Sequence, residues 1–166
     1  AVKAAIVNLH VGPGGKAFIE DSVCAVRVEK GGTLFIRQFN TEYTAEPRHS
    51  TLWTDQPWYN ASDDQKKDLD KNIKVHPGNL NDGGTFWALG IKSEGDGTLL
   101  TTINGGRSEI MGGLVYTNHA KNPDKKAFIV RDGSLSVSVG EWVSRHQPFN
   151  LLAETRAGEE RVLKPG

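Results

Sequence analysis

The stretch GGTFWALGIKSEGDGTLLTTINGGRSEIMGGLVY, from Gly83 to Tyr116, alternates short apolar runs with paired glycines and polar turns. Within it, the run from Thr98 to Ile103 is β-branched and apolar and is bounded by glycine-rich corners, a pattern typical of strands. The first twelve residues, Gly83 to Glu94, align without a gap with GGTLFIRQFNTE, from Gly31 to Glu42. An internal repeat of this kind predicts an architecture of similar units stacked on one another.

Paired glycines also punctuate the rest of the chain, beginning at Gly14, Gly31, Gly83 and Gly105. Short strands at such intervals fit either a β-sandwich or a β-solenoid. The ungapped repeat and the sharp glycine corners favour the solenoid, in which like residues of successive coils lie above one another. We therefore predict an all-β fold, a parallel β-helix in a single domain over residues 1–166, with a β-sandwich as the alternative. Trp87 is expected in the core or in a stack between coils.

The interval between Gly31 and Gly83 is longer than the others, which predicts an insertion over residues 44–81. Its composition is polar, with a charged run from Asp63 to Lys71 that reads as one solvated helix face. Insertions in repeat proteins project from one face of the stack, and that face often binds the ligand.

Aromatic residues in the insertion are candidates for carbohydrate binding, because sugar rings pack their apolar C–H faces against aromatic planes. The predicted substrate-binding residues are Trp53, Trp58 and Tyr59, and Arg48 is a candidate for an acidic sugar. In the other interpretation these aromatic side chains anchor the insertion onto the side of the solenoid.

Composition excludes several classes of partner. The chain has 20 Lys plus Arg and 20 Asp plus Glu, so its formal net charge is zero. Binding to nucleic acid or docking on an anionic membrane calls for a basic surface, so a neutral chain argues against either as the main role. No apolar run approaches the ~20 residues of a membrane-spanning helix. The single cysteine, Cys24, lies in an apolar strand-like run and is expected to be a buried, inert thiol.

Several segments resemble the C-terminal coils of right-handed parallel β-helix proteins of the pectate-lyase-like superfamily. They are GGKAFIEDSV, GGTLFIRQFNTE, FWALGIKSEGDGTLLTTINGGRSEIMGGLVY and ETRAGEERVL. The resemblance covers roughly residues 5–43 and 83–163. It implies a secreted or cell-surface protein with a polysaccharide or oligosaccharide ligand. It also implies the C-terminal part of a longer β-helix, whose N-terminal end is covered by upstream coils or by another protein chain.

Catalytic motifs of that superfamily are missing from this sequence. The aspartate trio, the Gly-His-Gly segment and the Arg-Ile-Lys segment of the polygalacturonase-like members do not occur, and neither does the aspartate ladder of the calcium-dependent lyases. Whether the chain is part of a glycosidase or a polysaccharide lyase is therefore left open. No cofactor motif is found, and the spacing of the five histidines matches no metal site.

Glu42 and Glu94 are the candidate catalytic residues, because they occupy equivalent positions in the repeat. In adjacent coils they would stack about 5 Å apart. Like charges at that distance raise one carboxyl pKa, as a general acid requires. In the alternative they are corner residues that face solvent or bind backbone. The leading functional hypothesis is thus polysaccharide processing or binding, and the alternative is a structural, assembly or adhesion solenoid.

Overall fold

The computed structural model describes residues 7–41, 79–94, 98–116, 126–143 and 150–163. These residues form eleven strands and no helix, so the fold of the described chain is all-β. The strands are β1 (Val7–Val11), β2 (Lys16–Glu29), β3 (Thr33–Asn40), β4 (Leu80–Asp82), β5 (Thr85–Glu94), β6 (Leu100–Ile103), β7 (Arg107–Tyr116), β8 (Lys126–Arg131), β9 (Ser134–Trp142), β10 (Asn150–Arg156) and β11 (Glu159–Leu163).

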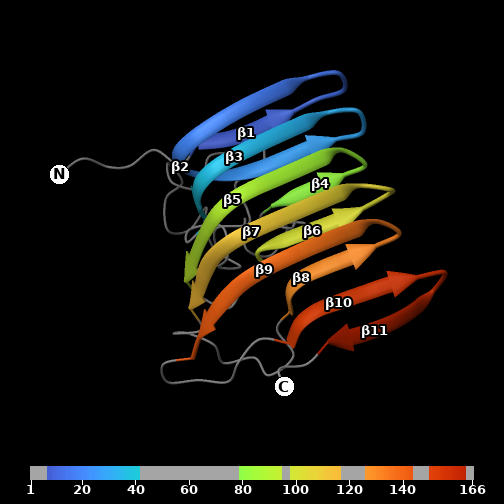
Figure 1. The fold of residues 1–166 in the computed structure, drawn as a ribbon. Coiled ribbons are helices and arrows are strands. Elements are labelled where there is room, and N and C mark those ends of the chain that lie inside the picture. Colours follow the sequence, from blue (N-terminus) through green and yellow to red (C-terminus); the bar gives the residue numbers. More distant parts are fainter. Residues whose placement is uncertain (1–6, 42–78, 95–97, 117–125, 144–149, 164–166) are drawn as a thin grey trace, which may run out of the picture.

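All eleven strands belong to one curled sheet with the order β11-β10-β8-β6-β4-β2-β3-β5-β7-β9, and β1 pairs with β2. Every neighbouring pair is parallel except the closing pair of β10 and β11. Figure 1 shows the longer strands β3, β5, β7 and β9 side by side, with the shorter β4, β6, β8 and β10 in a second row behind them. We call these the long-strand row and the short-strand row.

The chain alternates between the two rows, which explains why neighbours in the sheet are not neighbours in sequence. From each short strand a tight turn leads into the next long strand, as at Gly83-Gly84 between β4 and β5. The first glycine of such a turn has a positive φ, for example +82° at Gly31 and +78° at Gly83. This left-handed conformation costs glycine nothing because it has no Cβ.

Strand β2 contributes to both rows. Its first half, Lys16 to Val23, pairs with β3. Its second half pairs with β1 on one side and, from Arg27 on, with β4 on the other. The sequence indicates a turn at Asp21-Ser22, and the chain does bend at Asp21, where φ is +50°, but it stays within the sheet.

The internal repeat found in the sequence is confirmed by the strand register. Thr33 lies opposite Thr85, Leu34 opposite Phe86 and Asn40 opposite Lys92, so the ungapped alignment is the actual pairing of β3 with β5. The stacking of the repeats therefore follows directly from the backbone hydrogen bonds of a parallel ladder.

One bend recurs at the same position of four long strands. Asp21, Gln38, Gly90 and Gly112 all have positive φ, between +50° and +78°. The paired positions on either side of them show that these four residues lie side by side across the sheet. The long-strand row curls along this line of left-handed residues.

The core fills the space inside the curl, between the rows. Alternate residues of the long strands point inward, as expected from the two-residue period of a strand. The largest fully buried side chains are Phe39, Phe86, Phe128, Leu34, Ile36, Leu99, Leu100, Ile110, Val26, Val28 and Asn79. Leu80 begins β4, and Asn79 and Asn81 are buried, so the last residues of the predicted insertion belong to the sheet. Residues 44–78 of that insertion lie outside the described residues.

Candidate functional site

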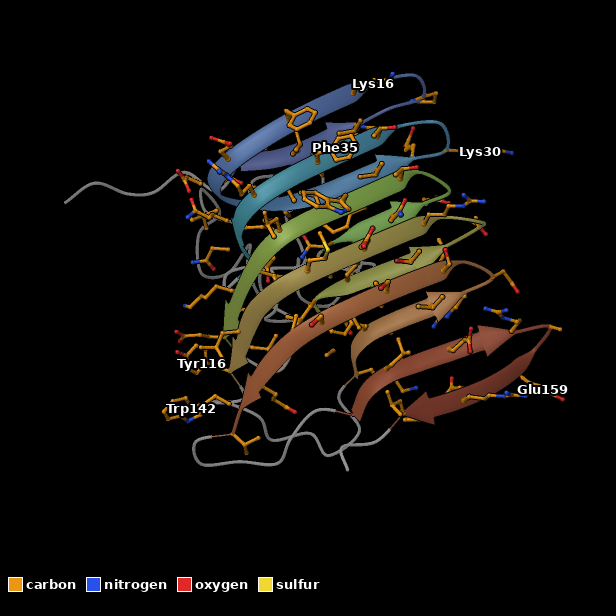
Figure 2. The ribbon with its side chains drawn as sticks, viewed as in Figure 1. Lys16, Lys30, Phe35, Tyr116, Trp142 and Glu159 are labelled. Atoms are coloured by element: carbon orange, nitrogen blue, oxygen red, sulfur yellow. The ribbon has the colours of Figure 1, made fainter. Side chains whose placement is uncertain are left out.

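A column of aromatic rings crosses the outward face of the long-strand row. Phe18 in β2 lies in register with Phe35 in β3, which lies in register with Trp87 in β5. The Phe18 and Phe35 rings stack with centroids 4.9 Å apart, and the Phe35 and Trp87 centroids are 6.1 Å apart. Phe18 is 82% exposed, and Figure 2 shows Phe35 standing out from the sheet. We call these three residues the aromatic column.

Beyond Trp87, the positions in register with the aromatic column are occupied by polar residues of β7 and β9. Glu109 in β7 lies opposite Trp87, and Ser136 in β9 lies opposite Glu109. A depression of about 400 Å³ covers this junction between the rings and the polar side chains. Its lining comprises Phe35, Thr85, Phe86, Trp87, Arg107, Ser108, Glu109, Ser134, Leu135 and Ser136.

The depression contains charged and hydroxyl-bearing side chains. Within the described part of the chain, neither Arg107 nor Glu109 forms an ion pair. The two side chains supply donors and an acceptor, and the Ser134 and Ser136 hydroxyls supply both. An aromatic plane beside convergent polar groups suits a ligand with one apolar face and a hydroxylated rim.

The lining favours binding over hydrolysis. Glycoside hydrolysis uses two carboxyl groups placed on either side of the scissile bond. Among the described residues that line the depression, Glu109 supplies the single carboxylate. Its chemistry is therefore that of a hydrogen-bond acceptor beside an aromatic platform.

Glu94, one of the two catalytic candidates, lies at the end of β5 and is paired with a cation. Lys92 Nζ lies 2.7 Å from Glu94 Oε1 and also lies over the Tyr116 ring, 6.0 Å from its centroid. The register of β3 with β5 extends to Asn40 opposite Lys92, and Glu42 lies outside the described residues. The expected carboxylate pair thus stays a prediction.

The predicted sugar-binding residues of the insertion, Trp53, Trp58, Tyr59 and Arg48, lie outside the described residues. Trp87, expected in the core or in a stack between coils, lies beside the Phe35 ring, but the sequence analysis did not name the aromatic column as a candidate binding surface. The repeat contained a signal for it, because the ungapped alignment already puts Phe35 beside Trp87. What the repeat alone could not show is which face of the strands these rings occupy.

A second aromatic pair lies at the far end of the long strands. Tyr116 and Trp142 stack with centroids 6.2 Å apart and an interplanar angle of 29°. Figure 2 shows the pair at the ends of β7 and β9, away from Phe35. This separation makes Trp142 a useful comparison for experiments on Trp87.

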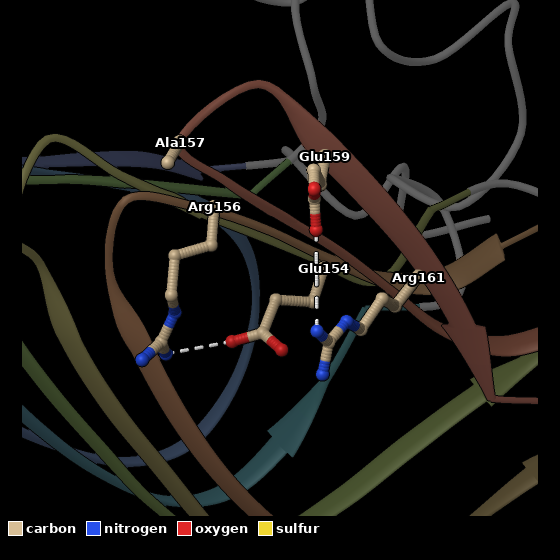
Figure 3. A pocket seen from close by; sticks show the side chains of 5 residues that line it. All are labelled: Glu154, Arg156, Ala157, Glu159 and Arg161. Carbon is tan, nitrogen blue, oxygen red and sulfur yellow. Dashed lines mark hydrogen bonds and ion pairs between the residues drawn. The ribbon is translucent and has the colours of Figure 1, made fainter.

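A charged depression at the β10–β11 hairpin is less suited to a ligand. Glu154 pairs with Arg156 at 2.7 Å, and Glu159 lies 4.0 Å from Arg161 (Figure 3). Ala157 completes the lining of this space of about 460 Å³. Because the two carboxylates and two guanidinium groups are already matched, no charge is left over to attract an ion.

Other chemistry finds little support in the described residues. No cluster of three or more His, Cys, Asp or Glu side chains there could hold a metal ion. No helix there could span a membrane. Cys24 is buried, as predicted, and burial raises the pKa of its thiol despite a weak contact with Ser22.

Comparison with protein-family models, curated proteins and solved structures found no match to this chain.

Proposed function

We propose that this chain is a polysaccharide-binding module, built as a right-handed parallel β-helix, which holds its ligand on the outward face of the long-strand row. The observation that carries the proposal is the aromatic column of Phe18, Phe35 and Trp87 next to Arg107 and Glu109. A location outside the cell or on its surface belongs to the same proposal, because that is where such ligands are met.

The β-helix part of the proposal rests on the alternation between rows and on the in-register stacking of like residues. In a solenoid each repeat packs against its neighbours, and residues of the same type occupy equivalent positions in successive coils. Thr33 opposite Thr85 and Phe35 opposite Trp87 follow this rule. The left-handed bends at one position of successive strands follow it as well.

The polysaccharide would run across the strands, because the aromatic column does so. Neighbouring strands are about 4.8 Å apart, and three rings on successive strands, of which Phe18 and Phe35 stack and Trp87 is tilted by 56° to Phe35, offer an apolar path to successive sugar units. A pair of aromatic rings contributes about 0.5–1.5 kcal/mol beyond area burial, and we expect a sugar face packed on a ring to contribute about as much. Arg107 and Glu109 would then bind the hydroxyl or charged groups of a unit beyond Trp87.

The decisive experiment is calorimetric titration with a panel of neutral and acidic oligosaccharides, with tryptophan fluorescence as a second readout. Trp87→Ala and Phe35→Ala are expected to weaken binding about tenfold each. Trp142→Ala, which removes an exposed tryptophan from the distant pair, is the matched control and should leave affinity unchanged. Binding that survives Trp87→Ala and Phe35→Ala but is lost in Trp53→Ala would move the site to the insertion. If no oligosaccharide binds, the proposal fails.

An assembly module is the second candidate function. One specific observation favours it: within the described residues, no strand pairs with the outer side of the first half of β2, at one end of the long-strand row. Such edges offer unpaired backbone groups to another strand.

A further inference from the structure

Among the described residues, the first half of β2 forms an edge of the sheet. Residues Lys16 to Val23 pair with β3 on one side, and within the described chain no strand pairs with their other side. The second half of the same strand differs, because β1 pairs with it from Cys24 to Val28. Figure 1 shows this part of β2 at the end of the long-strand row. An open edge of this kind is a template for adding a strand.

Side chains along this edge follow an order that is complementary to itself. Outward positions carry Lys16, Phe18 and Glu20, which are a cation, a ring and an anion. Inward positions carry Ala17 and Ile19, which pack against the core cluster. If a second copy of this strand is placed antiparallel to the first, with a twofold axis at Phe18, opposite charges face each other and apolar residues face apolar residues.

We propose that two copies of this chain pair through β2, antiparallel, with the twofold axis at Phe18. In this register Lys16 faces the partner's Glu20, Ala17 faces the partner's Ile19, and Phe18 faces the partner's Phe18. Residues directly opposite in an antiparallel pair have Cα atoms about 4.5–5.5 Å apart. Both twofold-related ion pairs and the ring contact then lie on the outward face of one continuous sheet.

Existing contacts on this face are compatible with the pairing. Glu20 already pairs with Arg37 at 2.9 Å, and its side chain is 61% exposed, so a second cation can reach it. Phe18 is the most exposed of the exposed large hydrophobic side chains, and the proposed contact covers it. The aromatic column would become continuous across the two copies, because Phe18 already stacks on Phe35.

The opposite edge of the long-strand row lacks this complementarity. Strand β9 presents Ser134, Ser136 and Ser138 outward, and it carries Glu141 but no Lys or Arg, so it cannot pair a cation with an anion of a second copy. Serine hydroxyls give no preference for one register or one partner strand. The argument for a second copy is thus specific to β2.

Sedimentation velocity on the whole chain over a range of concentrations tests the inference. Wild type is expected to show a monomer–dimer equilibrium. Lys16→Glu and Glu20→Lys each put like charges opposite one another twice and should raise the dimer Kd about tenfold or more. An equimolar mixture of the two variants should dimerise again, because the mixed dimer sets two acidic side chains of one copy against two basic side chains of the other. Arg161→Glu, a charge reversal at an exposed position of β11, is the matched control and should behave like wild type.

Disulfide trapping gives a test that does not depend on charge. In a Cys24→Ser background, Phe18→Cys should form an intermolecular disulfide on mild oxidation, since the expected Cα separation allows one. Leu89→Cys, also outward and partly exposed but on β5, should not. A wild type that stays monomeric at all concentrations overturns the inference. So does a dimer that is insensitive to Lys16→Glu and Glu20→Lys, or one that Leu89→Cys traps as readily. Phe18 is shared by the two proposals, whereas Lys16→Glu and Glu20→Lys leave all three rings of the aromatic column in place and Trp87→Ala leaves β2 unchanged. Loss of dimerisation in the charge variants and loss of oligosaccharide binding in Trp87→Ala therefore test the two proposals separately.

Discussion

Asn81 in β4 donates a hydrogen bond from its Nδ2 to the Oγ of Ser108 in β7, at 2.9 Å, inside the core. The same amide nitrogen donates to the carbonyl oxygen of Arg107, and the amide oxygen accepts from the Gly84 N–H. Ser108 in turn shares a 2.8 Å hydrogen bond with Thr102 in β6. These hydrogen bonds connect the short-strand row to the long-strand row. They fix the relative position of the two rows more specifically than apolar contacts would, because hydrogen bonds are directional.

Replacing Asn81 should test how much this polar cluster stabilises the fold. Asn81→Ala removes both donors and the acceptor and leaves the buried Gly84 N–H without its partner. Leaving a buried polar group unsatisfied costs about 1–3 kcal/mol. We expect the free energy of unfolding in urea to fall by about 2–3 kcal/mol, while Ser136→Ala on the outward face of β9 changes it by less than about 0.5 kcal/mol. Equal effects of the two substitutions would contradict the assignment.

Gly84 is predicted to be intolerant of any side chain. A Cβ there would lie 2.5 Å from Val28 Cγ1 and 2.7 Å from the Glu29 carbonyl oxygen. Overpacking of this kind costs about 1–3 kcal/mol, so Gly84→Ala should lower the thermal midpoint by several degrees. Gly12→Ala is the control, because a Cβ at Gly12 meets nothing within 4 Å. Calorimetry that finds both substitutions harmless would show that the turn between β4 and β5 packs less tightly against β2 than described.

The recurring bend makes a prediction with opposite signs at neighbouring positions. Gln38 adopts φ +55° and Gly90, beside it, adopts φ +78°. A side chain in the left-handed region costs roughly 1–2 kcal/mol relative to glycine. Gly90→Ala should therefore destabilise the protein by about 1 kcal/mol, whereas Gln38→Gly should leave stability unchanged or raise it by up to about 1 kcal/mol. Urea midpoints measured for both variants decide the matter, and a loss of stability in Gln38→Gly would count against the bend.

Cys24 should couple stability to alkaline pH. Burial raises the pKa of its thiol above the ordinary value. Above about pH 8.5, the ordinary thiol pKa, the unfolded chain releases this proton more readily than the folded chain. The stabilisation is therefore fully present below that pH and is lost as pH rises toward the folded pKa. The free energy of unfolding should be measured for wild type and Cys24→Ala between pH 7 and pH 10. The two should depend on pH in the same way near pH 7, and above about pH 8.5 that of wild type should fall more steeply.

The same burial predicts a slow thiol. The thiolate is the reactive form, so a thiol reagent should modify native Cys24 far more slowly than the urea-unfolded chain. A free cysteine peptide under the same conditions sets the reference rate. Native modification at the reference rate would mean that Cys24 is accessible and would contradict the packing described for β2.

Local chemistry in the sequence was sufficient for much of the fold. Paired glycines marked the corners, and the ungapped match of Gly31–Glu42 with Gly83–Glu94 gave the register of β3 with β5. The burial of Cys24 followed from its apolar neighbours. These features were readable because each depends on a few adjacent residues or on a repeat that preserves them.

Tertiary structure decided which residues from distant strands contact one another and which strand edge is left unpaired within the described residues. The repeat already placed Phe35 beside Trp87, but Phe18 joins them in one column only because β2 pairs with β3 in parallel. Asn81 is buried because β4 packs behind the long strands, which its polar side chain gave no reason to expect. Within the described residues, the first half of β2 is left as an edge because β2 takes part in both rows while β1 pairs only with its second half. Hydrogen bonds between distant segments set these relationships, and no local pattern encodes them.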